Sequence, residues 1–162
     1  MKFIASCLVA LAMTIPGLAL ADEEIGRIDA ALGDDRISLP TIIATRGDEV
    51  SPTAYLLQIG GGMSSLNIQG YEPGKGQFII SLTYMKNVPE AQTPPIDMTI
   101  QYMPPDAGGS YWTSDDAPTP PQITHTTLAL DGKEGRAVGT FAGVMCFAET
   151  YESSRADLQK LE

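Results

Sequence analysis

The chain has 162 residues, of which 43% are hydrophobic and 19% are charged, with 20 acidic side chains against 10 basic ones. A formal net charge of −10 repels phosphate backbones and anionic lipid head groups, so nucleic acid and membrane surfaces are excluded as expected partners. The length corresponds to one ordinary domain with a sizeable core.

The first 21 residues have the pattern of a cleavable secretory signal peptide. Lys2 provides a positive start, residues 3–15 are mostly apolar, and Pro16 breaks the run before it is long enough to span a bilayer. Ala19-Leu20-Ala21 fits a cleavage site, so we expect cleavage after Ala21 and export to the bacterial periplasm or the medium. The predicted mature chain, residues 22–162, is a single acidic domain with no stable membrane insertion.

Cys146 is the only cysteine left after this cleavage. An intramolecular disulfide is therefore impossible in the mature chain. In an oxidising compartment the remaining choices are a buried thiol, a bridge between chains or a reactive residue. Burial is the default expectation, because free cysteine behaves as a small hydrophobic residue.

Short β-type runs recur from residue 26 onward, separated by turns rich in Gly, Pro, Asp and Asn. In the best patterned run, 77–85, Phe78, Ile80, Leu82 and Tyr84 alternate with other residues, which predicts a strand with one buried face. The predicted strands are 26–32, 36–45, 53–59, 65–71, 77–85, 96–103, 123–130 and 136–147.

Two further segments complete the expected organisation. Residues 104–122 contain five prolines and predict a long exposed loop, with a short strand at Tyr111–Thr113. Asp131-Gly132 predicts a tight hairpin turn between the last two strands. In the returning strand, the face with Val138, Thr140, Ala142, Val144 and Cys146 is predicted to point toward the core. Residues 153–162 fit either a short terminal helix or a loop that leads into a last strand.

Eight or nine strands with little helix predict an all-β fold, which we interpret as a single antiparallel β-sandwich. A barrel is the alternative. Irregular loop lengths and the Pro-rich excursion favour the sandwich.

No catalytic motif stands out. His125 is the only histidine, so any nucleophile–base pair that uses histidine must include it, and no Gly-x-Ser-x-Gly motif is present. His125 lies within a predicted strand, where a structural role is the simpler interpretation. We therefore expect a protein that is not an enzyme and needs no cofactor.

Metal-binding motifs with the usual ligand spacing are also missing from the sequence, and no metal site is predicted. A softer alternative is copper(I), which methionine, Cys146 and His125 could bind. The methionines are scattered, and core packing explains most of them. They are Met63, Met85, Met98, Met103 and Met145.

The Pro-rich loop contains the one candidate ligand site. Tyr111 and Trp112 lie near Asp115 and Asp116, and aromatic faces with carboxylates nearby suit a sugar ring or a cationic ligand. The competing interpretation is that Trp112 closes one end of the core. The expected function is thus a non-enzymatic binding or interaction module for an unknown protein or small ligand. A copper-binding protein and a small-ligand carrier, the latter requiring a closed barrel, are the alternatives.

Overall fold

The computed structural model describes residues 22–47, 49–115, 117–131 and 135–149. This part of the chain is built from strands in antiparallel sheets and contains no helix, as the sequence predicts. The described residues form eleven strands, against eight or nine predicted for the chain. Their bounds are β1 Glu23–Leu32, β2 Asp35–Arg46, β3 Glu49–Pro52, β4 Ala54–Gly60, β5 Met63–Glu72, β6 Gly76–Tyr84, β7 Asp97–Met103, β8 Tyr111–Thr113, β9 Gln122–Leu130, β10 Gly135–Ala142 and β11 Cys146–Ala148.

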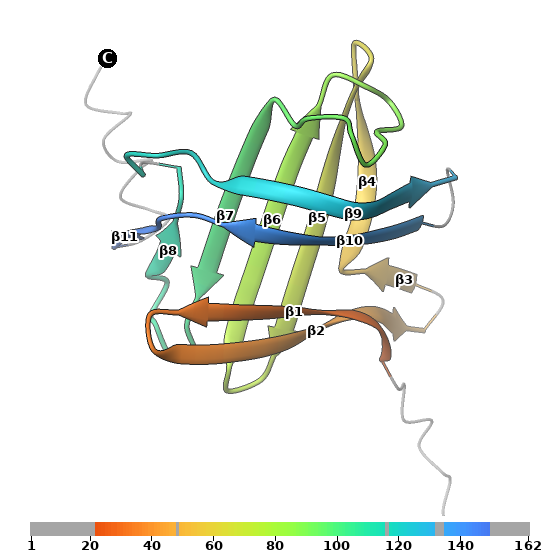
Figure 1. The fold of residues 1–162 in the computed structure, drawn as a ribbon. Helices are drawn as coiled ribbons and strands as arrows, with labels where there is room; N and C mark the ends of the chain where they lie inside the picture. The colour runs from red at the N-terminus through yellow and green to blue at the C-terminus, as the bar shows by residue number, and fades with distance from the viewer. Residues whose placement is uncertain (1–21, 48, 116, 132–134, 150–162) are drawn as a thin grey trace, which may run out of the picture.

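The strands form two layers (Figure 1). One layer is a six-stranded sheet in the order β11-β8-β7-β6-β5-β4. The other consists of the hairpin β9–β10 and the three-stranded sheet β1-β2-β3, both of which run crosswise over the first layer. Such crossing of strands is the orthogonal type of sheet packing. The described sheets are open, so the sandwich is confirmed and the barrel is not formed in this part of the chain.

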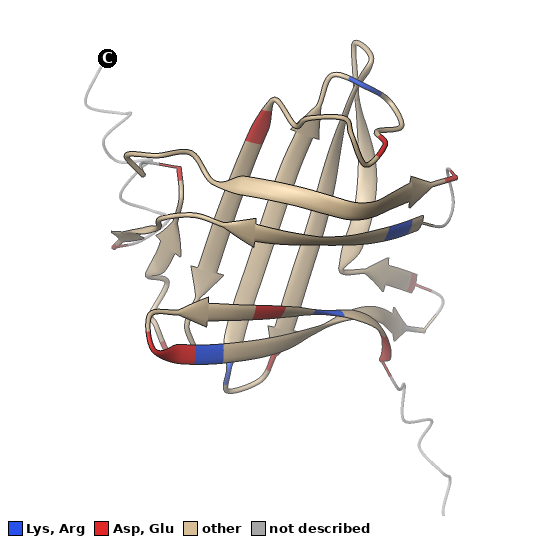
Figure 2. Cartoon of the chain, in the orientation of Figure 1, with Lys and Arg blue, Asp and Glu red and all other residues tan. Residues whose placement is uncertain are grey.

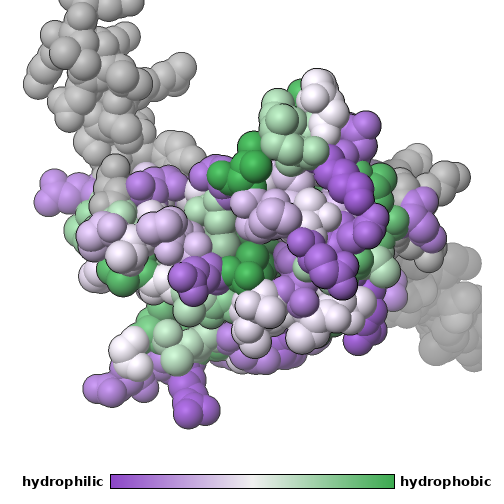
Figure 3. All heavy atoms as spheres, turned by 45° about the horizontal axis from the view of Figure 1, so that its top comes forward, coloured by the Kyte–Doolittle hydropathy of each residue, from purple (hydrophilic) through white to green (hydrophobic). Residues whose placement is uncertain are grey.

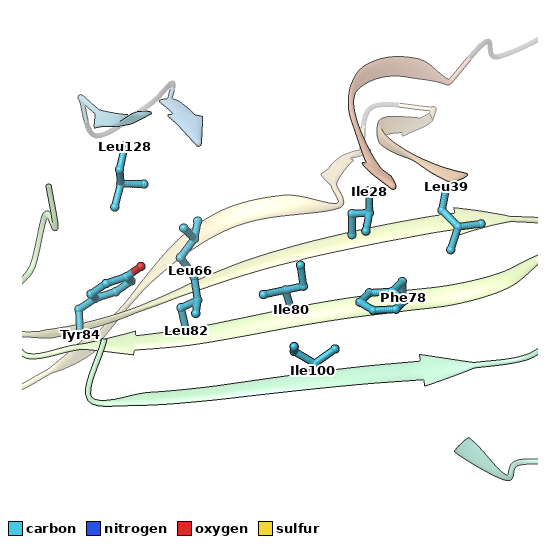
Figure 4. Packing of buried hydrophobic residues seen from close by; sticks show 9 residues of the cluster. All are labelled: Ile28, Leu39, Leu66, Phe78, Ile80, Leu82, Tyr84, Ile100 and Leu128. Atoms are coloured by element: carbon cyan, nitrogen blue, oxygen red, sulfur yellow. The ribbon is translucent and has the colours of Figure 1, made fainter. Parts of the chain in front are cut away.

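The core lies between the two layers. Alternate residues of β6, Phe78, Ile80, Leu82 and Tyr84, are all buried, as their spacing predicts. Figure 4 shows these side chains rising from the sheet toward Ile28, Leu39 and Leu128 of the crossing strands. The whole buried set is Ile28, Leu39, Leu66, Phe78, Ile80, Leu82, Tyr84, Ile100 and Leu128.

Gly70 allows the two layers to approach closely where β2 crosses β5. A Cβ atom at this position would lie 2.8 Å from the Cβ atom of Leu39 and 3.0 Å from its carbonyl oxygen. A side chain therefore does not fit there without moving one layer, and a glycine is required for packing.

Charged residues are almost confined to the crossing layer and the loops (Figure 2). In the six-stranded sheet only Glu72 and Asp97 are charged, and both stand at strand ends. The hairpin β1–β2, by contrast, contains a surface cluster in which Arg27 pairs with Glu24 at 2.9 Å and donates to Ser38. The strands of the large sheet thus expose a nearly neutral surface on a strongly acidic chain.

The predicted returning strand 136–147 differs from the structure in two ways. The chain leaves the hairpin after Ala142, and its last part, β11, joins the six-stranded sheet instead. The predicted core face is also wrong, because Val138 and Val144 are 41% and 49% exposed, whereas Phe141 and Met145 pack on the core. The register shifts between Val138 and Gly139, and the larger side chains take the buried face.

Two sequence-based predictions lie outside the described residues: the signal peptide at 1–21 and the terminal segment 153–162. Within the described ranges, no helix is long and apolar enough to cross a membrane.

Candidate functional site

A row of four aromatic side chains crosses the six-stranded sheet. Phe78 of β6 is directly opposite Tyr102 of β7, Tyr102 is opposite Trp112 of β8, and Trp112 is opposite Phe147 of β11. Directly opposite residues of antiparallel strands lie on the same face. The row therefore follows one face of the sheet, the one that contacts the crossing layer at β6.

This row begins in the core and ends in solvent. Phe78 is 1% exposed and packs against Phe141 of the β9–β10 hairpin, with ring centroids 5.5 Å apart. Trp112 is 40% exposed and Phe147 is 55% exposed. We name the outer part of the row, Tyr102, Trp112 and Phe147, the aromatic ledge.

The two outermost rings of the aromatic ledge meet edge to face. The centroids of Trp112 and Phe147 are 5.4 Å apart and their planes are inclined by 64°. This is a preferred geometry for aromatic pairs, and it presents two apolar ring surfaces at an angle to each other. Cross-strand pairing of β8 with β11 holds both rings next to each other on the same face of the sheet.

The sequence predicts a ligand site at Tyr111, Trp112, Asp115 and Asp116, but the structure places the described ones on opposite faces of the sheet. Trp112 lies on the ledge face, whereas its strand neighbour Tyr111 alternates to the opposite face. Asp115 also lies on that opposite face, where its carboxylate accepts a hydrogen bond from Thr99 at 2.7 Å. Asp116 lies outside the described residues. Trp112 is thus separated by the sheet from the aspartate that the sequence places beside it.

Two residues that the sequence did not single out contribute to the ledge and its surroundings. Phe147 supplies the second exposed ring, and Asp35, the first residue of β2, supplies a carboxylate near Tyr102. Burial raises the pKa of the Tyr102 hydroxyl, and the negative charge of Asp35 adds to this rise. Sequence reasoning missed both residues because they come from distant strands. The only signal for Phe147 was an aromatic residue in a short apolar run.

His125 contacts the core rather than the ledge. Its Nε2 atom is 2.7 Å from the hydroxyl of the fully buried Tyr84. Burial lowers the pKa of His125 and raises that of Tyr84 to about 12, so both groups are neutral near pH 7. A neutral imidazole can then accept the hydrogen bond that the buried hydroxyl donates. This arrangement agrees with a structural role for His125.

The soft donors proposed for copper lie in different environments. Met98 and Met145 pack against the core, Met85 is exposed, and Nε2 of His125 is engaged by Tyr84. Among the described residues, no three His, Cys, Asp or Glu side chains are close enough together to hold a metal ion.

Surface hollows offer less specific candidates than the ledge. One hollow, of about 720 Å³, is open to solvent and lies beside the 85–90 loop and the end of the β9–β10 hairpin. Lys86 and Glu90 on its rim pair with each other at 2.6 Å. Phe78, Ile80 and Tyr84, which would line the cavity of a small-ligand carrier if the strands closed into a barrel, are buried in the packed core.

Comparisons with known proteins found no matching family model, no similar curated protein and no similar solved structure.

Proposed function

We propose that the protein is an exported, non-enzymatic binding module that holds a carbohydrate chain on the aromatic ledge. The observation that carries the proposal is the exposed, edge-to-face pair of Trp112 and Phe147. Isolated apolar residues on a surface need no explanation, but two large exposed rings fixed against each other form a defined contact surface.

The chemistry of the ledge favours a sugar ring. The apolar C–H face of a sugar can stack on one ring while its edge contacts the other. The indole N–H of Trp112 and the carboxylate of Asp35 are available as hydrogen-bonding groups in this region. The acidic chain disfavours phosphorylated or sulfated ligands, whereas neutral and amino sugars carry no such penalty.

The shape of the region supports a polymer rather than a small enclosed ligand. The ledge lies on β7, β8 and β11, at one end of the six-stranded sheet, and within the described part of the chain it is not part of an enclosed cavity (Figure 1). Small molecules that bind tightly are usually enclosed in concave pockets. The engagement of His125 with Tyr84 in the core also supports a binding role over a histidine-dependent reaction.

The test is affinity electrophoresis in gels that contain hydroxyethyl cellulose, xylan or dextran, together with sedimentation on insoluble chitin and peptidoglycan. The wild-type protein is expected to be retarded or captured by at least one polymer. The variant Trp112→Ala should lose that retention, since truncating a central aromatic residue commonly removes 2 kcal/mol or more of binding energy, about a thirtyfold loss of affinity.

The matched control is Tyr71→Ala. Tyr71 is 47% exposed, similar to Trp112, but lies opposite Gln77 on the other face of the sheet. It should leave retention unchanged. Failure of every polymer to retain the wild type, or equal retention of Trp112→Ala, contradicts the proposal.

A further inference from the structure

The edge strand β4 differs from the other free edges of the described sheets. It is the last strand of the six-stranded sheet and pairs only with β5. Its sequence, AYLLQIG, contains neither a charge nor a proline. Edge strands normally carry such residues because they prevent pairing with another chain.

The remaining edges are protected in these ways. Strand β1 has the charged Arg27 and Asp29, β3 has Glu49 and Pro52, and β10 has Arg136. Strand β9, the other edge of the β9–β10 hairpin, has neither a charge nor a proline, but a bulge at Thr126 interrupts its pairing. Strand β11, at the opposite edge of the large sheet, has only three residues. Of the described edges, β4 alone is uncharged and also exposes three large apolar side chains. Its pairing with β5 is regular from Ala54 to Gln58 and shifts only at Ile59.

Apolar side chains are also exposed along β4. Tyr55 is 45% exposed, Leu57 is 52% exposed and Ile59 is 45% exposed. Figure 3 shows exposed hydrophobic residues in separate patches among hydrophilic ones, so a run of three within one strand stands out. Tyr55 and Leu57 are opposite Asn67 and Ser65, which places both on the outer, uncharged face of the sheet.

The hydrogen-bond pattern shows which backbone groups of β4 point outward. The amide of Gln69 donates to the carbonyl of Thr53, so Thr53 and the residues two and four further on, Tyr55 and Leu57, bond toward β5. The N–H and C=O groups of the alternate residues Ala54, Leu56 and Gln58 therefore point away from the sheet.

We propose that β4 pairs antiparallel with β4 of a second copy of this chain, across a two-fold axis at Leu56. Two copies with a net charge of −10 repel each other, and this repulsion opposes a contact least at an uncharged strand such as β4. An antiparallel edge is also self-complementary, as a two-fold interface requires. The result is one continuous sheet across both copies.

In this register the outward backbone groups of the two copies are paired, and their side chains face each other in complementary pairs. Leu56 lies opposite Leu56 of the partner subunit, and Ala54 lies opposite Gln58 of the partner subunit, so all the outward groups bond in pairs. On the outer face Tyr55 is opposite Leu57 of the partner subunit, and the symmetric pair repeats the contact. Aromatic–aliphatic pairs of this kind stabilise antiparallel sheets.

Sedimentation velocity of the purified protein at micromolar concentrations tests the assembly. The wild type is expected to be a dimer. The double variant Tyr55→Lys/Leu57→Lys places lysines opposite each other in both symmetric pairs and should raise the dissociation constant about tenfold or more. The control Val138→Lys introduces the same charge on β10, at a residue that is 41% exposed, and should remain dimeric.

Amide exchange measured by NMR distinguishes this interface from any other. In the proposed dimer the amides of Ala54, Leu56 and Gln58 are protected, and in the folded double variant they exchange rapidly while Tyr55 and Leu57 stay protected by β5. A monomeric wild type, a dimer that survives the double variant, or rapid exchange of these three amides in the dimer overturns the proposal.

Discussion

The centre and the β8–β11 end of the six-stranded sheet share one aromatic row but have opposite environments. At the centre, Phe78 is covered by Phe141 of the crossing hairpin. At the end, Trp112 and Phe147 continue the same row without such a cover and remain exposed. Similar residues therefore stabilise the fold at one place and are free to contact a ligand at the other.

Truncating the aromatic row at its two ends should give the largest difference in the free energy of unfolding. Phe78→Ala removes a buried ring and leaves a cavity, so the free energy of unfolding should fall by about 3–5 kcal/mol. Phe147→Ala removes a ring that is already half exposed and should cost less than about 1 kcal/mol. Urea unfolding of both variants measures the difference, and equal losses would contradict the division between the two regions.

Close approach of the layers at the centre predicts a second effect. Gly70→Ala should lower the free energy of unfolding by about 1–3 kcal/mol, because the new methyl group meets Leu39 at 2.8 Å. Gln69→Ala changes the neighbouring residue, whose side chain is on the outer face, and serves as the control. Thermal unfolding of the pair checks the prediction, and a Gly70→Ala protein as stable as the control would refute it.

The hydrogen bond between Tyr84 and His125 should stabilise the core at the centre of the sheet, and its loss should leave the aromatic ledge unchanged. His125→Ala leaves a buried hydroxyl without its partner, at a cost of about 1–3 kcal/mol. A double-mutant cycle with Tyr84→Phe should give a coupling energy of at least about 0.5 kcal/mol. Strictly additive losses would show that the contact contributes nothing.

A smaller effect should accompany a change of pH. The pKa of folded His125 lies below the value of 6.5 for an exposed imidazole, because burial disfavours the charged form. Below pH 6.5 the unfolded chain thus binds a proton that the folded chain does not. Proton binding to His125 therefore leaves the free energy of unfolding unchanged above pH 6.5. It lowers that free energy as the pH falls from 6.5 toward the folded pKa.

Urea unfolding at several pH values on both sides of 6.5 measures this dependence, with His125→Ala as the reference. The wild type should lose more stability on acidification than the variant. Identical slopes in the two proteins would show that His125 has no lowered pKa in the fold.

Much of the fold was predictable because alternation in the sequence determines which residues are buried. In β6 every second side chain is large and apolar, and the buried face follows directly. The last hairpin was harder, because both of its faces carry apolar residues. There the bulge at Thr126, which shifts the register at Gly139, and the size of Phe141 decide the inward face, and neither effect is visible as alternation.

The candidate site was predictable only in part. Trp112 was identified from the unusual composition of its loop. The residues that accompany it were not, because strand pairing brings Phe147 to Trp112 and the start of β2 brings Asp35 near Tyr102. Conversely, Asp115 is close in sequence, but alternation along the strand puts it on the other face. Proximity in sequence therefore misidentified the partners of the ring.

Fluorescence of Trp112 tests the central claim most directly, because it is the only tryptophan in the chain. If the aromatic ledge binds sugar, acrylamide should quench the emission readily in the free protein. Saturation with an oligosaccharide of the retained polymer should shift the emission and protect it from quenching. An emission that is shielded from acrylamide in the free protein, or that is unchanged by every saccharide, would contradict the account.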